Sequence, residues 1–348
     1  FEAMKHQPHK GLFDEHDVLA KLNALNDLLP RLGRMIDWEA FRPVVEKAFP
    51  SHDPRKGGRP PYDRVMLLKV LVLQRIYDLS DDAAEYQIND RLSFRQFLGL
   101  ELQHRVPDAK CIWHYREQLR KAEVFDALFD AFVERIEAAG LLLNQGKIVD
   151  ATMVKAPVQR NSRDENECIK QGRAPRGWSP SKARQKDIDA RWGSKHGKHH
   201  FGYKNHVKVD RHSKLIDNFV VSPANMHDSQ ALPDLAEDCD AGQQYLADSA
   251  YGTPDNHAAM REMEISLQAV EQARRNKPLT ERQRLWNKVR SRVRARVEHV
   301  FGHMTMCIKG LTIRCRGLDR AHAQIAMANL TYNFQRVLYL NRNAMGNV

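Results

Sequence analysis

The sequence predicts a mixed α/β layer that follows an all-helical N-terminal region. Through residues 1–140, apolar side chains recur at the three- and four-residue spacing of amphipathic helices. From residue 147 onward, short apolar runs and period-2 alternation are typical of strands. At 348 residues the chain also exceeds the usual size of one domain. We therefore expect a helical region over 1–140 and an α/β region over 141–348.

Two helix starts in the N-terminal region bracket a possible helix-turn-helix over residues 80–120. Ser80 precedes two acidic residues and Asp108 precedes a second helical run, so both are placed as capping residues. In such a unit, the second helix would present Lys110 and Arg116 to DNA. An ordinary helical hairpin is the alternative. An earlier helix is predicted by the helical spacing of Met66, Leu67, Val70, Leu71, Gln74 and Tyr77.

Before these elements, residues 53–61 combine prolines, glycines and basic residues, Arg59 among them. Such a composition cannot form regular structure. It predicts a basic arm or linker that could lie along a DNA backbone or in a minor groove. A plain solvated loop is the alternative.

The second half predicts a layer of strands and helices. Residues 147–152 form a first apolar run, 200–210 alternate with one buried face and 214–222 form a third strand, which together predict an antiparallel meander. A fourth strand is expected to end at Asp248. A helix over 253–263, a strand over 265–270 and a long basic helix complete the layer. The polar stretch 159–198 is expected to be a mobile insertion or partly disordered without DNA.

Three acidic residues stand out from this pattern. Asp150 and Asp248 each end a buried strand, whereas Glu298 lies in a helix crowded with arginine. Carboxylates suit Mg²⁺, so we expect two Mg²⁺ ions, or Mn²⁺ in their place, at about 3.5 to 4 Å from each other on a phosphodiester. For the two aspartates the alternative is a local turn cap. For Glu298 it is an ion pair with Arg294, one helical turn away.

The basic helix carries candidate phosphate ligands. Arg290 and Arg294 are predicted to share a face with Glu298. Lys204 or His206, on the polar face of the second strand, could also steady the phosphate, or simply face solvent. An apolar stripe is predicted at Leu285, Val289, Val293, Val297, Val300 and Met304.

Other histidines are assigned smaller roles. His196, His199, His200 and His206 invite a zinc hypothesis, which the carboxylate set and the absence of a suitably spaced thiolate disfavour. His227 with Asp228 is typical of a helix cap, with a supporting position beside the metal ligands as the alternative.

Charge and cysteine usage narrow the class of protein. The net charge of +11 and the pI near 9.4 predict a polyanionic partner. Fourteen basic residues face three acidic ones between Arg274 and Arg320, a phosphate-binding footprint for which a solvated helix face is the alternative. Five scattered cysteines predict reduced thiols in the cytoplasm. No apolar run reaches the roughly 18 residues of a membrane span, so no membrane partner is expected.

Several stretches resemble the DDE transposases of bacterial insertion sequences, specifically the insertion sequence 5 group. The likeness is specific at Arg294-Ala295-Arg296-Val297-Glu298-His299-Val300-Phe301-Gly302. It extends over most of the chain through these further stretches: Val149-Asp150-Ala151-Thr152, Phe201-Gly202-Tyr203-Lys204-Asn205-His206, Ala224-Asn225-Met226-His227-Asp228-Ser229, Ala247-Asp248-Ser249-Ala250-Tyr251-Gly252, Gly58-Arg59-Pro60-Pro61-Tyr62 and Met327-Ala328-Asn329-Leu330.

The resemblance implies an RNase H-like core in which Asp150, Asp248 and Glu298 are the DDE triad. Related families carry a Tyr, Arg, Glu, Lys signature on the last helix. Arg294 matches its arginine, whereas Ser291 and Thr305 stand where the tyrosine and the lysine are expected. Lys309 is the alternative for the lysine.

The expected function is transposition. The protein would bind the inverted-repeat ends of its element, hydrolyse a strand with metal ions and join the 3′-hydroxyl to target DNA. Its expected partners are double-stranded end and target DNA and a second copy of the chain, in the bacterial cytoplasm with the nucleoid. A transposase-derived regulator that binds DNA without cutting it, and a metal-dependent nuclease without strand transfer, are the alternatives.

Overall fold

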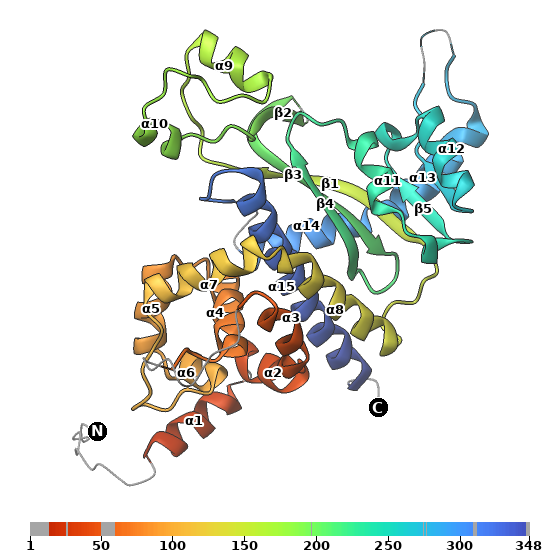
Figure 1. Cartoon of the computed structure of the whole chain (residues 1–348). Helices are drawn as coiled ribbons and strands as arrows, with labels where there is room; N and C mark the ends of the chain where they lie inside the picture. Colours follow the sequence, from red (N-terminus) through yellow and green to blue (C-terminus); the bar gives the residue numbers. More distant parts are fainter. Residues whose placement is uncertain are drawn as a thin grey trace, which may run out of the picture.

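The structure, a computed structural model, describes residues 14–25, 27–49, 60–195, 197–273, 275, 277–308 and 312–345. Of the basic segment expected over 53–61, residues 53–59 lie outside the described residues, and Arg59 is one of them. Lys309 and His196 also lie outside them. Figure 1 shows a helical region below a sheet, with a long C-terminal helix that runs from one to the other.

The helical region confirms the expected class and the expected caps. The Ser80 side chain accepts the Ala83 amide and the Asp108 side chain accepts the Cys111 amide, as their positions predict. The helices are α1 (Asp14–Ala24), α2 (Leu28–Met35), η1 (Trp38–Phe41), α3 (Arg42–Glu46), α4 (Arg64–Tyr77), α5 (Asp81–Asp90), α6 (Leu92–Leu98), α7 (Ala109–Lys121) and α8 (Val124–Ala138). α4 is nearly surrounded, since ten of its 14 residues are buried.

The sheet contains both parallel and antiparallel pairs in the order β2-β3-β1-β5-β6, with β4 paired to β3. Its strands are β1 (Lys147–Lys155), β2 (Arg191–Lys195), β3 (Lys198–Asp210), β4 (Ile216–Pro223), β5 (Gln244–Ala247) and β6 (Ser266–Ala269). β1, β3 and β4 form the expected antiparallel meander, and β5 joins β1 in parallel. The expected mixed α/β layer is therefore present.

The long strand β3 differs from the prediction of a single buried face. Residues 201–203 and 205–210 are buried without alternation, because one face meets the helical core and the other meets the elements that follow β4. Gly202 belongs to this strand at a close approach: a Cβ there would lie 2.1 Å from the Val154 carbonyl oxygen, and its φ is +149°.

The polar stretch 159–198 is not irregular throughout, which corrects the expectation of a disordered insertion. It contains α9 (Arg163–Lys170), α10 (Pro180–Gln185) and the edge strand β2. A capping box at Ser162 and Glu165 starts α9, and β2 pairs with β3 from Arg191 to Lys195. Short capped helices need little apolar surface, so hydropathy alone underestimates their order.

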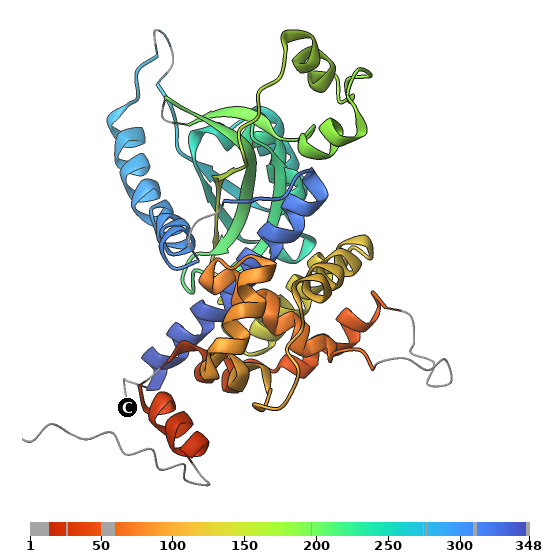
Figure 2. The same cartoon turned by 90° about the vertical axis from the view of Figure 1, so that its left-hand side faces the viewer.

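The expectation of a single basic helix along the apolar stripe is also wrong, because this stretch forms two helices. It consists of α13 (Glu281–Arg294) and α14 (Arg296–Met306), which meet at Ala295. Val297, Val300 and Met304 on α14 are fully buried, but Leu285 and Val289 on α13 are 66% and 57% exposed. No residue of α13 is buried, and the helix stands along the flank of the sheet (Figure 2).

The helical region and the sheet share one core. α15 (Leu318–Met345) packs against α2, α4, α8 and β4. Its Asn329 pairs with Asn205 of β3, and its Asn333 bonds both the amide and the carbonyl of Ile216. A smaller core on the other face of the sheet lies beneath α11 (Leu232–Leu235) and α12 (Pro254–Glu262). Among the described residues, no helix combines the length and apolarity that a membrane crossing requires.

Candidate active site

Asp150 and Asp248 occupy adjacent register positions on neighbouring strands; Asp248 directly follows β5, as expected, but Asp150 lies within β1 and not at its end, because β1 stays paired with β3 as far as Lys155. Val149 of β1 pairs with Ala247 of β5 in parallel register, so the next position on each strand is one of the two aspartates. Adjacent strands lie about 4.8 Å apart, and equivalent positions point to the same face. Two carboxylates from segments almost a hundred residues apart are thereby placed at one edge of the sheet.

Each aspartate uses one oxygen on a nearby amide, but only Asp248 caps a turn as the alternative predicts, because Asp150 lies within β1. Asp150 Oδ1 accepts the Ala151 amide at 2.8 Å, and Asp248 Oδ1 accepts the Ala250 amide at 2.8 Å, where it caps the short helix η5 (Ser249–Tyr251). The second oxygen of Asp248 has no partner among the described residues. Local capping therefore leaves ligand capacity at this edge of the sheet.

Asp150 is 7% exposed, and its second oxygen meets a cation. Arg294 Nη1 donates to Asp150 Oδ2 at 2.7 Å, so the alternative of an Arg294 to Glu298 ion pair does not hold. Burial raises the pKa of Asp150, as does the charge of Asp248, while Arg294 and Lys195 act against the rise. The site therefore holds two carboxylates whose mutual repulsion is partly offset by basic side chains.

Glu298 occupies the first turn of α14, which packs across β1 through its buried valines. Its side chain is exposed, and its carboxylate forms no hydrogen bond or ion pair with a described residue. Arg294, four residues earlier, reaches Asp150, so Glu298 stands close to the same edge. The ligand oxygens of the three acids do not all lie within 4.8 Å of one another.

Two residues beside the carboxylates were not identified from the sequence. Lys195 on β2 donates its Nζ to the Ala151 carbonyl at 2.7 Å. The Tyr251 hydroxyl is buried with no hydrogen-bond partner, and burial together with Asp228, Asp150 and Asp248 holds its pKa well above the ordinary value. Gly197 in a hairpin turn was the available signal for β2 and hence for Lys195. Nothing in the sequence singles out the Tyr251 hydroxyl.

The other expected phosphate ligands have protein partners. Lys204 Nζ donates to Asp228 Oδ1 at 2.6 Å and to the Met226 carbonyl, so it anchors the loop that follows β4. His206 is fully buried beside Ser222, and burial lowers its pKa to about 4. Their placement on a polar face was wrong, because this part of β3 has no solvent-facing side. The His227 ring accepts the Ser229 amide as a helix cap, as expected.

Arg290 and the helix-turn-helix residues differ in accessibility. Arg290 donates to the Ala269 carbonyl and to Gln268 Oε1, which ties α13 to β6. On α7, Arg116 pairs with Asp81, whereas Lys110 is exposed. Exposed basic side chains on α13 still form a continuous positive face; these are Arg282, Arg284, Lys288 and Arg292.

A second acidic group is chemically different. Glu237, Cys239 and Asp240 have ligand atoms within 4.8 Å of one another. The Lys208 ammonium already donates to both Glu237 and Asp240, at 2.6 Å for Asp240. Lys208 is 0% exposed; burial acts to lower its pKa, but Asp217 and Asp240 raise it overall. A protonated lysine therefore occupies the position that a cation would take.

Comparison with known families agrees with the family that the sequence motifs resemble. The family described as Transposase DDE domain matches residues 143–334, which is more than half of the 348-residue chain. A second family, described as Transposase domain (DUF772), matches residues 16–118. No solved structure gives a significant match. The carboxylate edge lies within the first match, and the chain belongs to the DDE transposase family.

Proposed function

We propose that this chain is a transposase of the insertion sequence 5 group. It binds the inverted-repeat ends of its element, hydrolyses a strand at the element end and joins the freed 3′-hydroxyl to target DNA. One observation carries the proposal: Asp150 on β1 and Asp248 after β5 take adjacent register positions on neighbouring strands, and the helix of Glu298 packs across β1. Membership of the family implies nuclease and transposition activity in general.

The donor set fits divalent cations. Asp150, Asp248 and Glu298 offer carboxylate oxygens, which Mg²⁺ and Mn²⁺ accept. Arg294 occupies one oxygen of Asp150, but the second oxygen of Asp248 and the Glu298 carboxylate have no partner among the described residues, and the unpaired Tyr251 hydroxyl is a spare donor for a water or an oxygen at the site. Two bound Mg²⁺ ions would supply charge stabilisation and an activated water for phosphodiester hydrolysis.

The protein's own groups position the DNA. Arg294 has donors to spare, since its Nε is buried without a partner and only Nη1 bonds Asp150. A guanidinium in this position can exchange a carboxylate for a phosphate oxygen. Lys195 neutralises charge beside Asp150 from the opposite strand. The exposed basic face of α13 and the Lys110 surface of α7 would hold the duplex.

The architecture around the site is proposed to be RNase H-like, with a helical DNA-binding and dimerisation region over 1–140 and a catalytic region over 141–348. Two copies would pair two element ends. Lys309 and Arg59, outside the described residues, remain candidate DNA contacts.

Strand cleavage and joining on DNA that carries the flanking inverted repeats test the proposal, with Mg²⁺ or Mn²⁺ and with the wild type beside Asp248→Asn. We expect metal-dependent nicks and joined products from the wild type alone. Nicks without joined products would identify a nuclease. End binding without any cleavage by the wild type would identify a DNA-binding regulator.

A further inference from the structure

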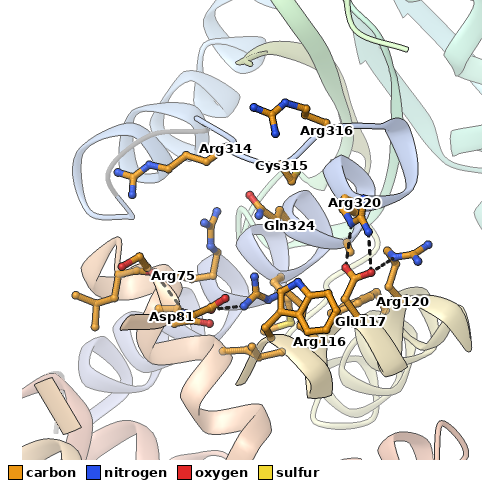
Figure 3. A pocket seen from close by; sticks show the side chains of 18 of the residues that line it. Arg75, Asp81, Arg116, Glu117, Arg120, Arg314, Cys315, Arg316, Arg320 and Gln324 are labelled. Atoms are coloured by element: carbon orange, nitrogen blue, oxygen red, sulfur yellow. Dashed lines mark hydrogen bonds and ion pairs between the residues drawn. The ribbon is translucent and has the colours of Figure 1, made fainter. Parts of the chain in front are cut away.

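A cavity of about 390 Å³ lies where the helical region meets the C-terminal part of the chain. Its walls come from α4, α5 and α7 on one side and from residues 312–327 on the other, with Arg184 of α10 at the margin. Figure 3 shows Arg75 rising from one wall and Arg314 and Arg316 on the opposite wall. The cavity belongs to neither the carboxylate edge nor the α13 face.

Seven arginines line this cavity, against three acidic residues. The three acidic residues already have arginine partners in the cavity wall. Asp81 pairs with Arg116, Glu117 pairs with Arg120 and Arg320, and Asp78 lies 3.4 Å from Arg314.

The other three arginines, Arg75, Arg184 and Arg316, form no ion pair or hydrogen bond with any residue of the described ranges. The cavity therefore holds three guanidinium groups that no ion pair binds, although the charge of Asp78 acts on Arg75.

Arg75 shows that the surplus has an energetic cost. It projects from the buried helix α4, and burial lowers its pKa; the charge of Asp78 opposes this shift, while those of Arg116 and Arg314 add to it. A guanidinium stays protonated at any physiological pH, so the crowding is not relieved by proton loss. An anion in the cavity would relieve it, since hydrogen bonds between arginine and phosphate are short and strong.

The cavity also has an apolar wall. Trp113 on α7 is 52% exposed at its rim, and Leu71, Phe125 and Met327 lie around it. An indole face next to guanidinium groups accepts a planar base or a deoxyribose while the phosphate takes the charge. An inorganic anion alone would leave this apolar wall uncovered.

The cavity is within reach of the carboxylate edge along one DNA molecule. Thr312 on its wall pairs with Lys155, five residues beyond Asp150 on β1, and the Ile313 amide donates to the Lys155 carbonyl. Five strand residues span about 16 Å. One DNA strand carries a phosphate about every 3.4 Å of helix axis, so about five nucleotides cover that distance.

We propose that this arginine cavity binds a phosphate and its nucleotide on a DNA strand whose cleavage site lies at the carboxylate edge. The inference rests on the proposed function for the identity of the DNA. Since the walls come from the helical region and from the segment before α15, one bound strand would hold the two parts of the chain together. The chemistry recognised is a phosphate with an adjacent planar base.

Binding of a labelled duplex with the inverted repeat, measured by fluorescence anisotropy in EDTA over about 50 to 200 mM salt, tests this. The cavity pair is Arg75→Gln with Arg316→Gln. The control pair is Arg163→Gln with Arg261→Gln, two exposed arginines on α9 and α12 whose side chains have no partner among the described residues, so both proteins lose two positive charges. Arg316→Gln alone, at an exposed position, covers the case in which Arg75→Gln disturbs the fold.

We expect the cavity pair to bind about tenfold more weakly, with a salt dependence shallower by about 0.9 for each DNA phosphate that the protein no longer neutralises. Trp113→Ala should weaken binding with little change in that slope, because stacking is not ionic. The control pair should keep both the affinity and the slope of the wild type. A cavity pair that binds like the control pair overturns the proposal.

Two further measurements distinguish other sources of the phosphate. Calorimetry with inorganic phosphate and with deoxyadenosine monophosphate tests a free ligand. If the nucleotide binds through the cavity arginines while duplex affinity is unchanged by the cavity pair, DNA is excluded as the ligand. Because binding is measured without metal, wild-type DNA binding that depends on the cavity but never leads to cleavage would refute the proposed function and leave this inference intact.

Discussion

The two ends of β5 carry acidic groups with opposite environments. Asp248 follows the strand and lies beside Asp150 at an edge where a single arginine and an exposed glutamate are near. Asp240 precedes the strand, is 1% exposed, and is bonded by Lys208 and by the Tyr245 hydroxyl. The second group has the tighter cluster of ligand atoms, yet its charge is already neutralised within the protein. We therefore place the proposed metal site by unsatisfied ligand capacity and not by the proximity of acids.

Removal of one carboxylate at the open edge should have the largest effect. Asp248→Asn keeps the shape and the cap of η5 but loses a charge that would bind metal. We expect the nicking rate to fall about 1,000-fold or more, equivalent to some 4 kcal/mol, because metal ions supply several kcal/mol of transition-state stabilisation. Thermal unfolding should be close to that of the wild type. A variant that nicks at more than a tenth of the wild-type rate would remove Asp248 from the site.

The same change at the other end of the strand should affect stability instead. Asp240→Asn leaves the buried Lys208 with fewer counter-charges, and breaking a buried ion pair from one side costs about 3 kcal/mol or more. Urea unfolding measures this difference. The folded fraction should still nick DNA at a normal rate. Nicking lost in fully folded protein, together with Mn²⁺ binding lost in calorimetry, would show that Glu237, Cys239 and Asp240 form the metal site.

Arg294 allows a finer comparison, because it occupies one oxygen of Asp150 at the open edge. Its removal should raise Mn²⁺ affinity about tenfold, some 1.4 kcal/mol, since a positive charge close to the cation is lost. Nicking should fall nevertheless if the guanidinium binds phosphate. Mn²⁺ titration followed by electron paramagnetic resonance measures binding directly, with Arg292→Ala, an exposed neighbour, as the matched control. Weaker Mn²⁺ binding in Arg294→Ala would contradict this role.

The last expected effect concerns β3, which carries Lys208 to the Asp240 group and holds the buried His206 against Ser222. The folded pKa of His206 is about 4, below its ordinary value of 6.5, because burial disfavours the charged ring. The unfolded chain therefore takes up the proton first as pH falls, so stability is fully present above about pH 6.5 and is lost towards pH 4.

Between pH 7 and 5 this linkage amounts to on the order of 2 kcal/mol. His206→Gln should remove that part of the pH dependence, while His257→Gln, on α12, should not. Urea unfolding at the two pH values measures both. An unchanged pH dependence in His206→Gln would mean that the ring titrates normally in the folded protein.

Local sequence patterns predicted some positions of the candidate site and missed others, depending on whether the position is set by neighbouring residues or by packing. Asp248 was placed correctly because it ends an apolar run at the point where β5 ends, whereas β1 continues past Asp150 to Lys155 because its pairing with β3 extends that far. Lys204 and His206 were misplaced because the sequence alternates as if one face were wet, although α15 and the elements after β4 cover both faces. Leu285 and Val289 were placed in a core because periodicity shows a stripe but not whether another element meets it.

The sequence by itself determined the family, the helical and α/β halves, the capped helix starts and the three acids, since all of these depend on residue type and spacing. The tertiary structure alone decided that Arg294 pairs with Asp150, that Lys195 and Tyr251 join the same edge, and that Lys208 neutralises the other acids. It also brought arginines from α4, α10 and the segment before α15 around one cavity. These contacts join residues far apart in the chain, and their energies depend on burial and neighbouring charge, which exist only after the chain has packed.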